Sequence, residues 1–81
     1  MNFLELHERL VYHLRERVRS GELTERGLAR MIRISQPHVH NVLKGKRLFS
    51  VGTADEILLQ LQLDLLDLMR PEDLLHWRRR R

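Results

Sequence analysis

Cysteine is absent from this chain of 81 residues. No disulfide framework and no thiolate zinc site can form, and this composition is compatible with a reducing cytoplasm. The N-terminus lacks the apolar stretch of a signal peptide, and no apolar run is long enough to cross a bilayer. We therefore expect a cytoplasmic protein without a membrane partner, built as one domain over residues 1–77 and followed by a basic tail at 78–81.

Catalytic and metal-binding motifs are also missing. The sequence has no glycine-rich phosphate loop and no His-Glu metal motif, and so small a core leaves no room for a buried substrate pocket. His38 and His40 are two residues apart, which at about 100° per residue places them on nearly opposite sides of a helix. His7 and His13 are no better spaced for one ion. We expect no enzymatic activity, no cofactor and no metal, and histidines that are either exposed or packed.

Acidic residues are missing from one long stretch of the chain. Residues 26–47 carry only basic charges, whereas residues 52–73 are rich in aspartate and glutamate. With 15 Lys and Arg against 11 Asp and Glu, the net charge is +4. A basic segment of this kind indicates an anionic partner, although the arginines of the tail contribute much of the excess charge.

Strand signals are absent as well, because alternation is missing, aromatic residues are few and the apolar residues fall at helical spacing. The pattern predicts an all-α fold whose first helix spans about residues 3–19. Thr24 is a suitable N-cap for a short second helix, and Ser35 for a third. With Ser35 as the cap, Pro37 lies in the first turn, where its missing N–H has no intrahelical acceptor to lose. Gly45 then suits the left-handed position after the end of this helix.

The C-terminal part of the chain is rich in leucine. Ser50 or Thr53 can cap a fourth helix, Asp64 can cap a short fifth one, and residues 71–73 can open a short helical extension. The apolar residues of this segment are Leu58, Leu59, Leu61, Leu63, Leu65, Leu66, Leu68, Met69, Leu74, Leu75 and Trp77. They exceed what one face of two short helices can bury in a monomer, so we expect a homodimer. The alternative is that the last of them, including Trp77, fold back over the first helix.

Two short helices joined by a tight turn, over about residues 24–44, are the pattern of a helix-turn-helix unit. The predicted core of this unit consists of Leu28, Ala29, Ile32, Ile34, Val39 and Val42. Ala29 is small enough to let the two helix axes approach each other, and Val39 is the residue expected to face it.

From Leu23 to about Met69 the sequence resembles the DNA-binding domains of phage-repressor and Cro-type (Xre-type) proteins. The resemblance is carried by "LTERGLARMI", "SQPHVHNVLKGKR" and "SVGTADEILLQLQLDLLDLM". It implies a compact five-helix, repressor-like fold with a short C-terminal helical extension. It also implies a transcriptional regulator, acting as a repressor, that binds duplex DNA sequence-specifically and is nucleoid-associated when bound. A homodimer of this kind occupies an operator with an inverted repeat.

The same resemblance places the helix at 36–44 in the major groove. The residues expected to contact bases are Gln36, Pro37, His40 and Asn41. Gln36 and Asn41 can bind adenine, His40 can donate to guanine, and Pro37 can touch a thymine methyl group. The residues expected to contact phosphates, which fix the register without recognising sequence, are Arg26, Arg33, Lys44, Lys46 and Arg47.

Two positions depart from the family pattern. Arg33 stands in the tight turn where glycine is common, and a positive φ there costs an arginine about 1 kcal/mol, although its charge can reach a phosphate. Glu25 stands where glutamine is common, near the DNA backbone, and a carboxylate there repels phosphate unless a neighbour such as Arg26 neutralises it. Protonation of His40 near a phosphate is expected to tighten binding.

Two other functions are compatible with the sequence. The first is a protein-interaction module, antitoxin-like or part of an adaptor, that uses the leucine-rich C-terminal segment as its main surface. The second is a nonspecific nucleoid-type binder, whose affinity falls steeply with salt but does not depend on sequence. Substitution of Gln36 and Asn41 separates the protein-interaction module from a specific DNA binder, because it leaves capture of a protein partner unchanged.

Overall fold

The computed structural model describes residues 2–69 and residue 72, and every regular element within them is an α-helix. The helices are α1 (Phe3–Arg19), α2 (Glu25–Ile32), α3 (Gln36–Leu43), α4 (Val51–Gln60) and α5 (Leu65–Leu68). The all-α prediction and the bounds of the first helix are confirmed. The predicted extension that opens at 71–73, apart from Glu72 itself, and the basic tail at 78–81 lie outside the described residues.

Polar side chains begin each helix. The caps of the first four helices are Asn2, Thr24, Ser35 and Ser50, and each accepts a hydrogen bond of 2.9 to 3.2 Å from the N–H three residues further on. Such a cap contributes about 1 kcal/mol to stability. Of the two caps considered for α4, Ser50 is the one used, and Thr53 lies inside the first turn. Asp64 begins α5 as predicted, because its carboxylate accepts the N–H of Asp67 at 3.1 Å.

Two residues with left-handed backbone shape the path of the chain around α3. Arg33 ends α2 with a φ of 61°, the conformation in which arginine is expected to be strained. Gly45 follows α3 with a φ of 81°, and its N–H donates to the Val42 carbonyl at 3.0 Å. The next N–H, that of Lys46, donates to the Asn41 carbonyl at 2.9 Å. These two bonds form a Schellman motif, which ends α3 and confirms the predicted role of Gly45.

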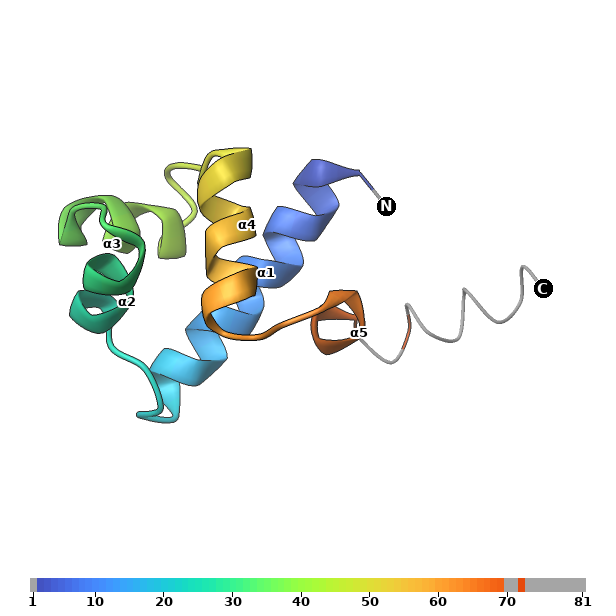
Figure 1. Cartoon of the computed structure of the whole chain (residues 1–81), viewed down its shortest axis with the longest axis horizontal. Helices are drawn as coiled ribbons and strands as arrows, with labels where there is room; N and C mark the ends of the chain where they lie inside the picture. Colours follow the sequence, from blue (N-terminus) through green and yellow to red (C-terminus); the bar gives the residue numbers. More distant parts are fainter. Residues whose placement is uncertain (1, 70–71, 73–81) are drawn as a thin grey trace.

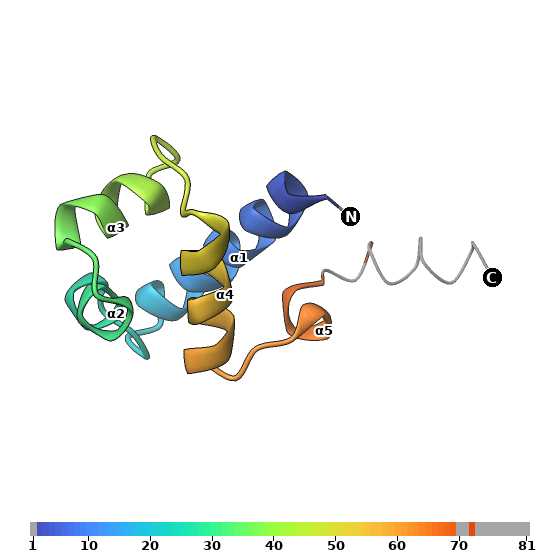
Figure 2. The same ribbon diagram turned by 45° about the horizontal axis from the view of Figure 1, so that its top comes forward.

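The core lies where α1 crosses the other helices. α2 and α3 pack against each other on one side of α4, whereas α5 packs on α1 at the other side (Figures 1 and 2). The largest fully buried side chains are Phe49, Leu10, Leu14, Leu28, Ile57, Val39 and Val42. Of the core residues predicted for the segment 24–44, all are buried except Ile34, which is half-buried against the same core.

A histidine and a phenylalanine complete this core. His7 of α1 is only 4% exposed, and its Nε2 accepts a hydrogen bond of 2.9 Å from the backbone N–H of Phe49. Phe49 lies in the loop before α4, and its ring stacks on that of His38 with centroids 6.3 Å apart. Burial lowers the pKa of His7, which favours the neutral ring that this hydrogen bond requires. His7 is thus a packed histidine, one of the two possibilities that the sequence allowed.

The leucine-rich segment divides between the core and the surface. Leu68 is buried, and Leu58, Leu61 and Leu63 are half-buried against the core. The exposed members are Leu59, which is 75% exposed, and Leu66, which is 69% exposed. The last predicted members, Leu74, Leu75 and Trp77, and with them the alternative that they fold back over the first helix, lie outside the described residues. Within residues 2–69 and 72, the helices lack the length and the apolar character that a membrane span needs.

Candidate nucleic-acid interface

One face of α3 carries the side chains that the sequence assigns to base contacts. Gln36, Pro37 and His40 are exposed, and Asn41 is half-buried. All four line one open hollow, whose fifth wall is Glu25 from the first turn of α2. The four residues occupy positions i, i+1, i+4 and i+5, which share one side of a helix, while the apolar residues of α3 are buried on the other. The structure thus brings the predicted base contacts together on one accessible face.

Glu25 contacts His40 directly. Nδ1 of His40 lies 3.2 Å from one carboxylate oxygen of Glu25 and 3.3 Å from the other. The sequence suggested Arg26 as the neutralising neighbour of this carboxylate, whereas the partner in the structure is a residue of the predicted recognition face. The Glu25 side chain is 27% exposed and that of His40 is 49% exposed, so the pair lies at the edge of the hollow, accessible to a ligand.

Cationic side chains cluster where α3 ends. Lys44, Lys46 and Arg47 are exposed around the turn that Gly45 makes. Sequence reasoning missed a further cation, Arg15 of α1, whose Nε donates to the carbonyl oxygen of Leu43 in the last turn of α3. Because these two residues are 28 positions apart, no local pattern links them, and only the packing of α1 on α3 reveals the contact.

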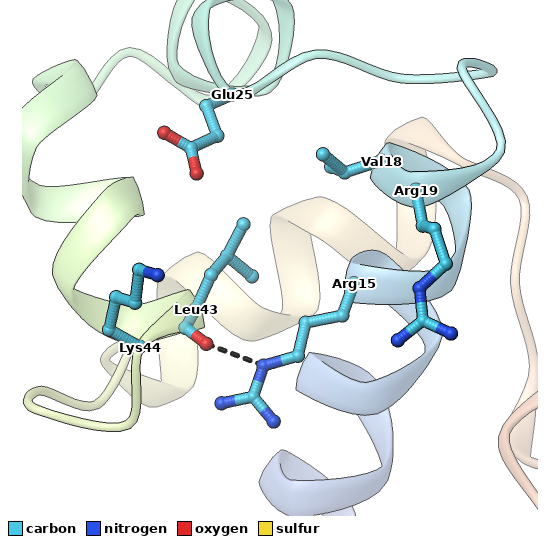
Figure 3. Close-up of a pocket in the computed structure, with 6 residues that line it drawn as sticks. All are labelled: Arg15, Val18, Arg19, Glu25, Leu43 and Lys44. Carbon is cyan, nitrogen blue, oxygen red and sulfur yellow. Dashed lines mark hydrogen bonds between the residues drawn. The ribbon is translucent and has the colours of Figure 1, made fainter.

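A second hollow lies beside this cluster, between α1 and the α2–α3 pair. Its walls are Arg15, Val18, Arg19, Glu25, Leu43 and Lys44. Figure 3 shows Arg15 and Arg19 entering from α1, Lys44 from the end of α3 and the Glu25 carboxylate from α2. Glu25 therefore borders both hollows, with His40 in one and three cations in the other. Arg19 also pairs with Glu16 at 3.5 Å, and the cations that line this hollow still outnumber the carboxylate that lines it, which suits an anionic ligand.

The other predicted phosphate contacts are accessible and precede α3 in the chain. Arg26 is exposed in the first turn of α2, and Arg33 is exposed in the connection to α3. The positive φ of Arg33 turns the chain sharply between the two helices. All five predicted phosphate contacts are therefore on the surface, and three of them follow α3 directly.

The histidines do not come together in the part of the chain that the structure describes. His38 packs on Phe49, and His40 contacts Glu25. His13 is half-buried on α1, where burial in the first place and then the charge of Arg17 lower its pKa. Within residues 2–69 and 72, no group of three or more potential ligands is arranged to hold a metal ion.

Comparisons of the chain with models of protein families, with curated proteins and with solved structures found no match.

The polar side chains on the accessible face of α3 determine which ligands the interface can bind. The side-chain amides of Gln36 and Asn41 each present a donor and an acceptor, and His40 adds a ring nitrogen opposite the one that contacts Glu25. Such groups can bind the edges of planar heterocycles by paired hydrogen bonds, and the neighbouring cations can bind phosphate.

Proposed function

We propose that α2 and α3 form a helix-turn-helix unit that binds duplex DNA sequence-specifically, and that the protein regulates transcription by occupying an operator as a repressor. One observation carries the proposal. The accessible face of α3 combines Gln36, His40 and Asn41 around one hollow, and the turn after this helix exposes cations without a carboxylate among them. An ordinary solvated helix face usually alternates acidic and basic residues instead.

The dimensions of α3 suit the major groove. A helix of eight residues is about 12 Å long and about 10 Å wide, and the major groove is about 12 Å wide. Gln36 and Asn41 can each form a bidentate pair with adenine, which discriminates against a wrong base by about 1–3 kcal/mol. Lys44, Lys46 and Arg47 then lie where the backbone passes the end of the helix, together with Arg15 from α1.

Assembly as a homodimer on an inverted repeat belongs to this proposal. The exposed leucines Leu59 and Leu66 are apolar groups that a second copy can cover. The same two residues also support the competing function, a protein-interaction module without sequence-specific DNA binding. Sequence-specific DNA binding requires the polar face of α3, whereas capture of a protein partner does not.

Selection of duplexes from a random pool at near-physiological salt tests the proposal. The wild-type protein should enrich a motif, in an inverted repeat if it dimerises. The double variant Gln36→Ala with Asn41→Ala should lose that motif. Gln60→Ala, which truncates an exposed glutamine on α4, is the matched control and should retain it.

Two results would contradict specific binding. If no sequence is enriched, the proposal that the protein binds an operator fails under these conditions. Binding that weakens steeply with salt but is equal for all duplexes would identify a nonspecific binder instead.

A further inference from the structure

We infer that Glu25 determines which bases His40 accepts, by holding the proton of the imidazole on Nδ1. The inference rests on the proposed DNA-binding function and concerns one contact within it. It assigns to Glu25 the role of a positioning residue for specificity, although its place in the family pattern suggests only an unfavourable charge near phosphate.

The geometry of the Glu25–His40 pair determines which ring nitrogen of His40 carries the proton. Both carboxylate oxygens of Glu25 lie within hydrogen-bond reach of the same ring atom, Nδ1 of His40, at 3.2 and 3.3 Å. A carboxylate only accepts hydrogen bonds, so Nδ1 must be the donor. A neutral imidazole carries one proton, and Nε2 is then left without one. Nε2 becomes a hydrogen-bond acceptor on the side of the ring away from Glu25.

The carboxylate of Glu25 borders a second hollow as well as the one that His40 lines. Arg15, Arg19 and Lys44 line that second hollow with it (Figure 3), where Arg15 donates to the carbonyl of Leu43 and Arg19 pairs with Glu16 at 3.5 Å. Lys44, the C-cap of α3, follows His40 by one helical turn. The contact with His40 is thus the one that the Glu25 carboxylate makes within the described residues, and it orients the ring with Nδ1 toward Glu25.

An acceptor at Nε2 changes the expected base. In the major groove, adenine presents the N6 amino group and cytosine the N4 amino group as donors, whereas guanine presents only acceptors at O6 and N7. Nε2 of a neutral His40 therefore pairs with adenine or cytosine. Guanine opposite it leaves two acceptors facing each other, both without a donor. The guanine preference expected of a donating histidine is thus reversed, with adenine or cytosine favoured about tenfold.

The first part of the test needs no DNA. Long-range proton–nitrogen spectra of the free protein at pH 8 report which ring nitrogen of His40 carries the proton. The wild type should show Nδ1 protonated and Nε2 unprotonated. Glu25→Ala should move both nitrogens toward the values of a tautomer mixture. Glu22→Ala removes an exposed carboxylate that pairs with Arg17 instead of His40, and it should leave the spectrum unchanged. A proton on Nε2 in the wild type, in either a neutral or a charged ring, overturns the inference.

The second part measures base preference by duplex selection at the same pH. His40→Ala identifies the base position that this side chain contacts, because the preference there disappears. At that position the wild type and Glu22→Ala should favour adenine or cytosine over guanine about tenfold, and Glu25→Ala should reduce the ratio to about one. A guanine preference in the wild type, or an unchanged ratio in Glu25→Ala, overturns the inference while specific binding stands. Absence of any enrichment instead refutes the proposed function, and the base preference with it.

Discussion

The contact between His7 and Phe49 gives the sharpest prediction for stability. His7→Ala removes a ring that lies 5.8 Å from Phe3 and 5.7 Å from Phe49, measured between ring centroids, and it leaves the N–H of Phe49 without its acceptor. An unsatisfied buried N–H costs about 1–3 kcal/mol, and the cavity adds to this. We expect a loss of about 3 kcal/mol in the free energy of unfolding, a large share of the 5–15 kcal/mol or so that is typical of small domains.

Acidification should weaken the same contact. Burial holds the pKa of His7 below the value of 6.5 that the unfolded chain has. The unfolded state therefore binds the proton first, and the stability that the neutral ring contributes is present above about pH 6.5 and lost as the pH falls below it. For this one group the loss is at most about 1.4 kcal/mol per pH unit. His13, whose pKa burial also lowers, adds a loss of the same sign.

Urea unfolding followed by circular dichroism at pH 7.5 and pH 5.5 measures both effects. The variant His7→Gln is the matched control, because its amide oxygen can accept the N–H of Phe49 and does not titrate in this range. It should lose less stability on acidification than the wild type, and the difference isolates His7 from all other groups. Equal losses in the two proteins would show that protonation of His7 does not oppose folding. A larger loss in His7→Gln than in the wild type would reverse the sign and refute the reasoning.

Three further substitutions follow from the backbone and the charges around α3. Arg33→Gly relieves a φ of 61° and should raise the free energy of unfolding by about 0.5–1 kcal/mol in urea unfolding, while weakening DNA binding. Gly45→Ala places a side chain at a φ of 81° and should lower the free energy of unfolding by about 1 kcal/mol in the same assay; no loss would mean that the turn adapts. Lys46→Gln should weaken binding to all duplexes alike and reduce the slope of log affinity against log salt by about one, whereas a changed motif would assign Lys46 to a base contact.

Local signals in the sequence account for the start and end of most helices. Thr24 and Ser35 cap the helices that follow them because a side-chain oxygen needs only an N–H three residues away. Gly45 can be predicted in the same way, because the position after α3 needs a positive φ that glycine adopts readily. The choice between Ser50 and Thr53 was open because both are good caps. Capping by Ser50 places the buried Phe49 immediately before the cap, where an apolar residue packs on the first turns of the helix.

Contacts between helices could not be predicted in this way. The pair of His7 and Phe49 is separated by 42 residues, and the hydrogen bond from Arg15 to the carbonyl of Leu43 by 28. The contact of Glu25 with His40 joins two residues that the sequence assigned to separate tasks, one near phosphate and one near bases. Each of these contacts exists only after α1, α2 and α3 have packed, and spacing rules act within about one helical turn.

These long-range contacts explain how so short a helix can present a fixed face. α3 has eight residues, fewer than the roughly 12 that an isolated helix needs in water, and its valines, histidines and asparagine are weak helix formers. Contacts with other segments of the chain hold α3 in place. His38 stacks on Phe49 near the start of α3, and Arg15 binds a carbonyl in its last turn. Glu25 contacts His40 between these two points. One of these three contacts, that of Glu25 with His40, involves a side chain of the polar face itself. Because packing with α1 and α2 has already ordered this face, a ligand that binds α3 loses little affinity to the cost of ordering it.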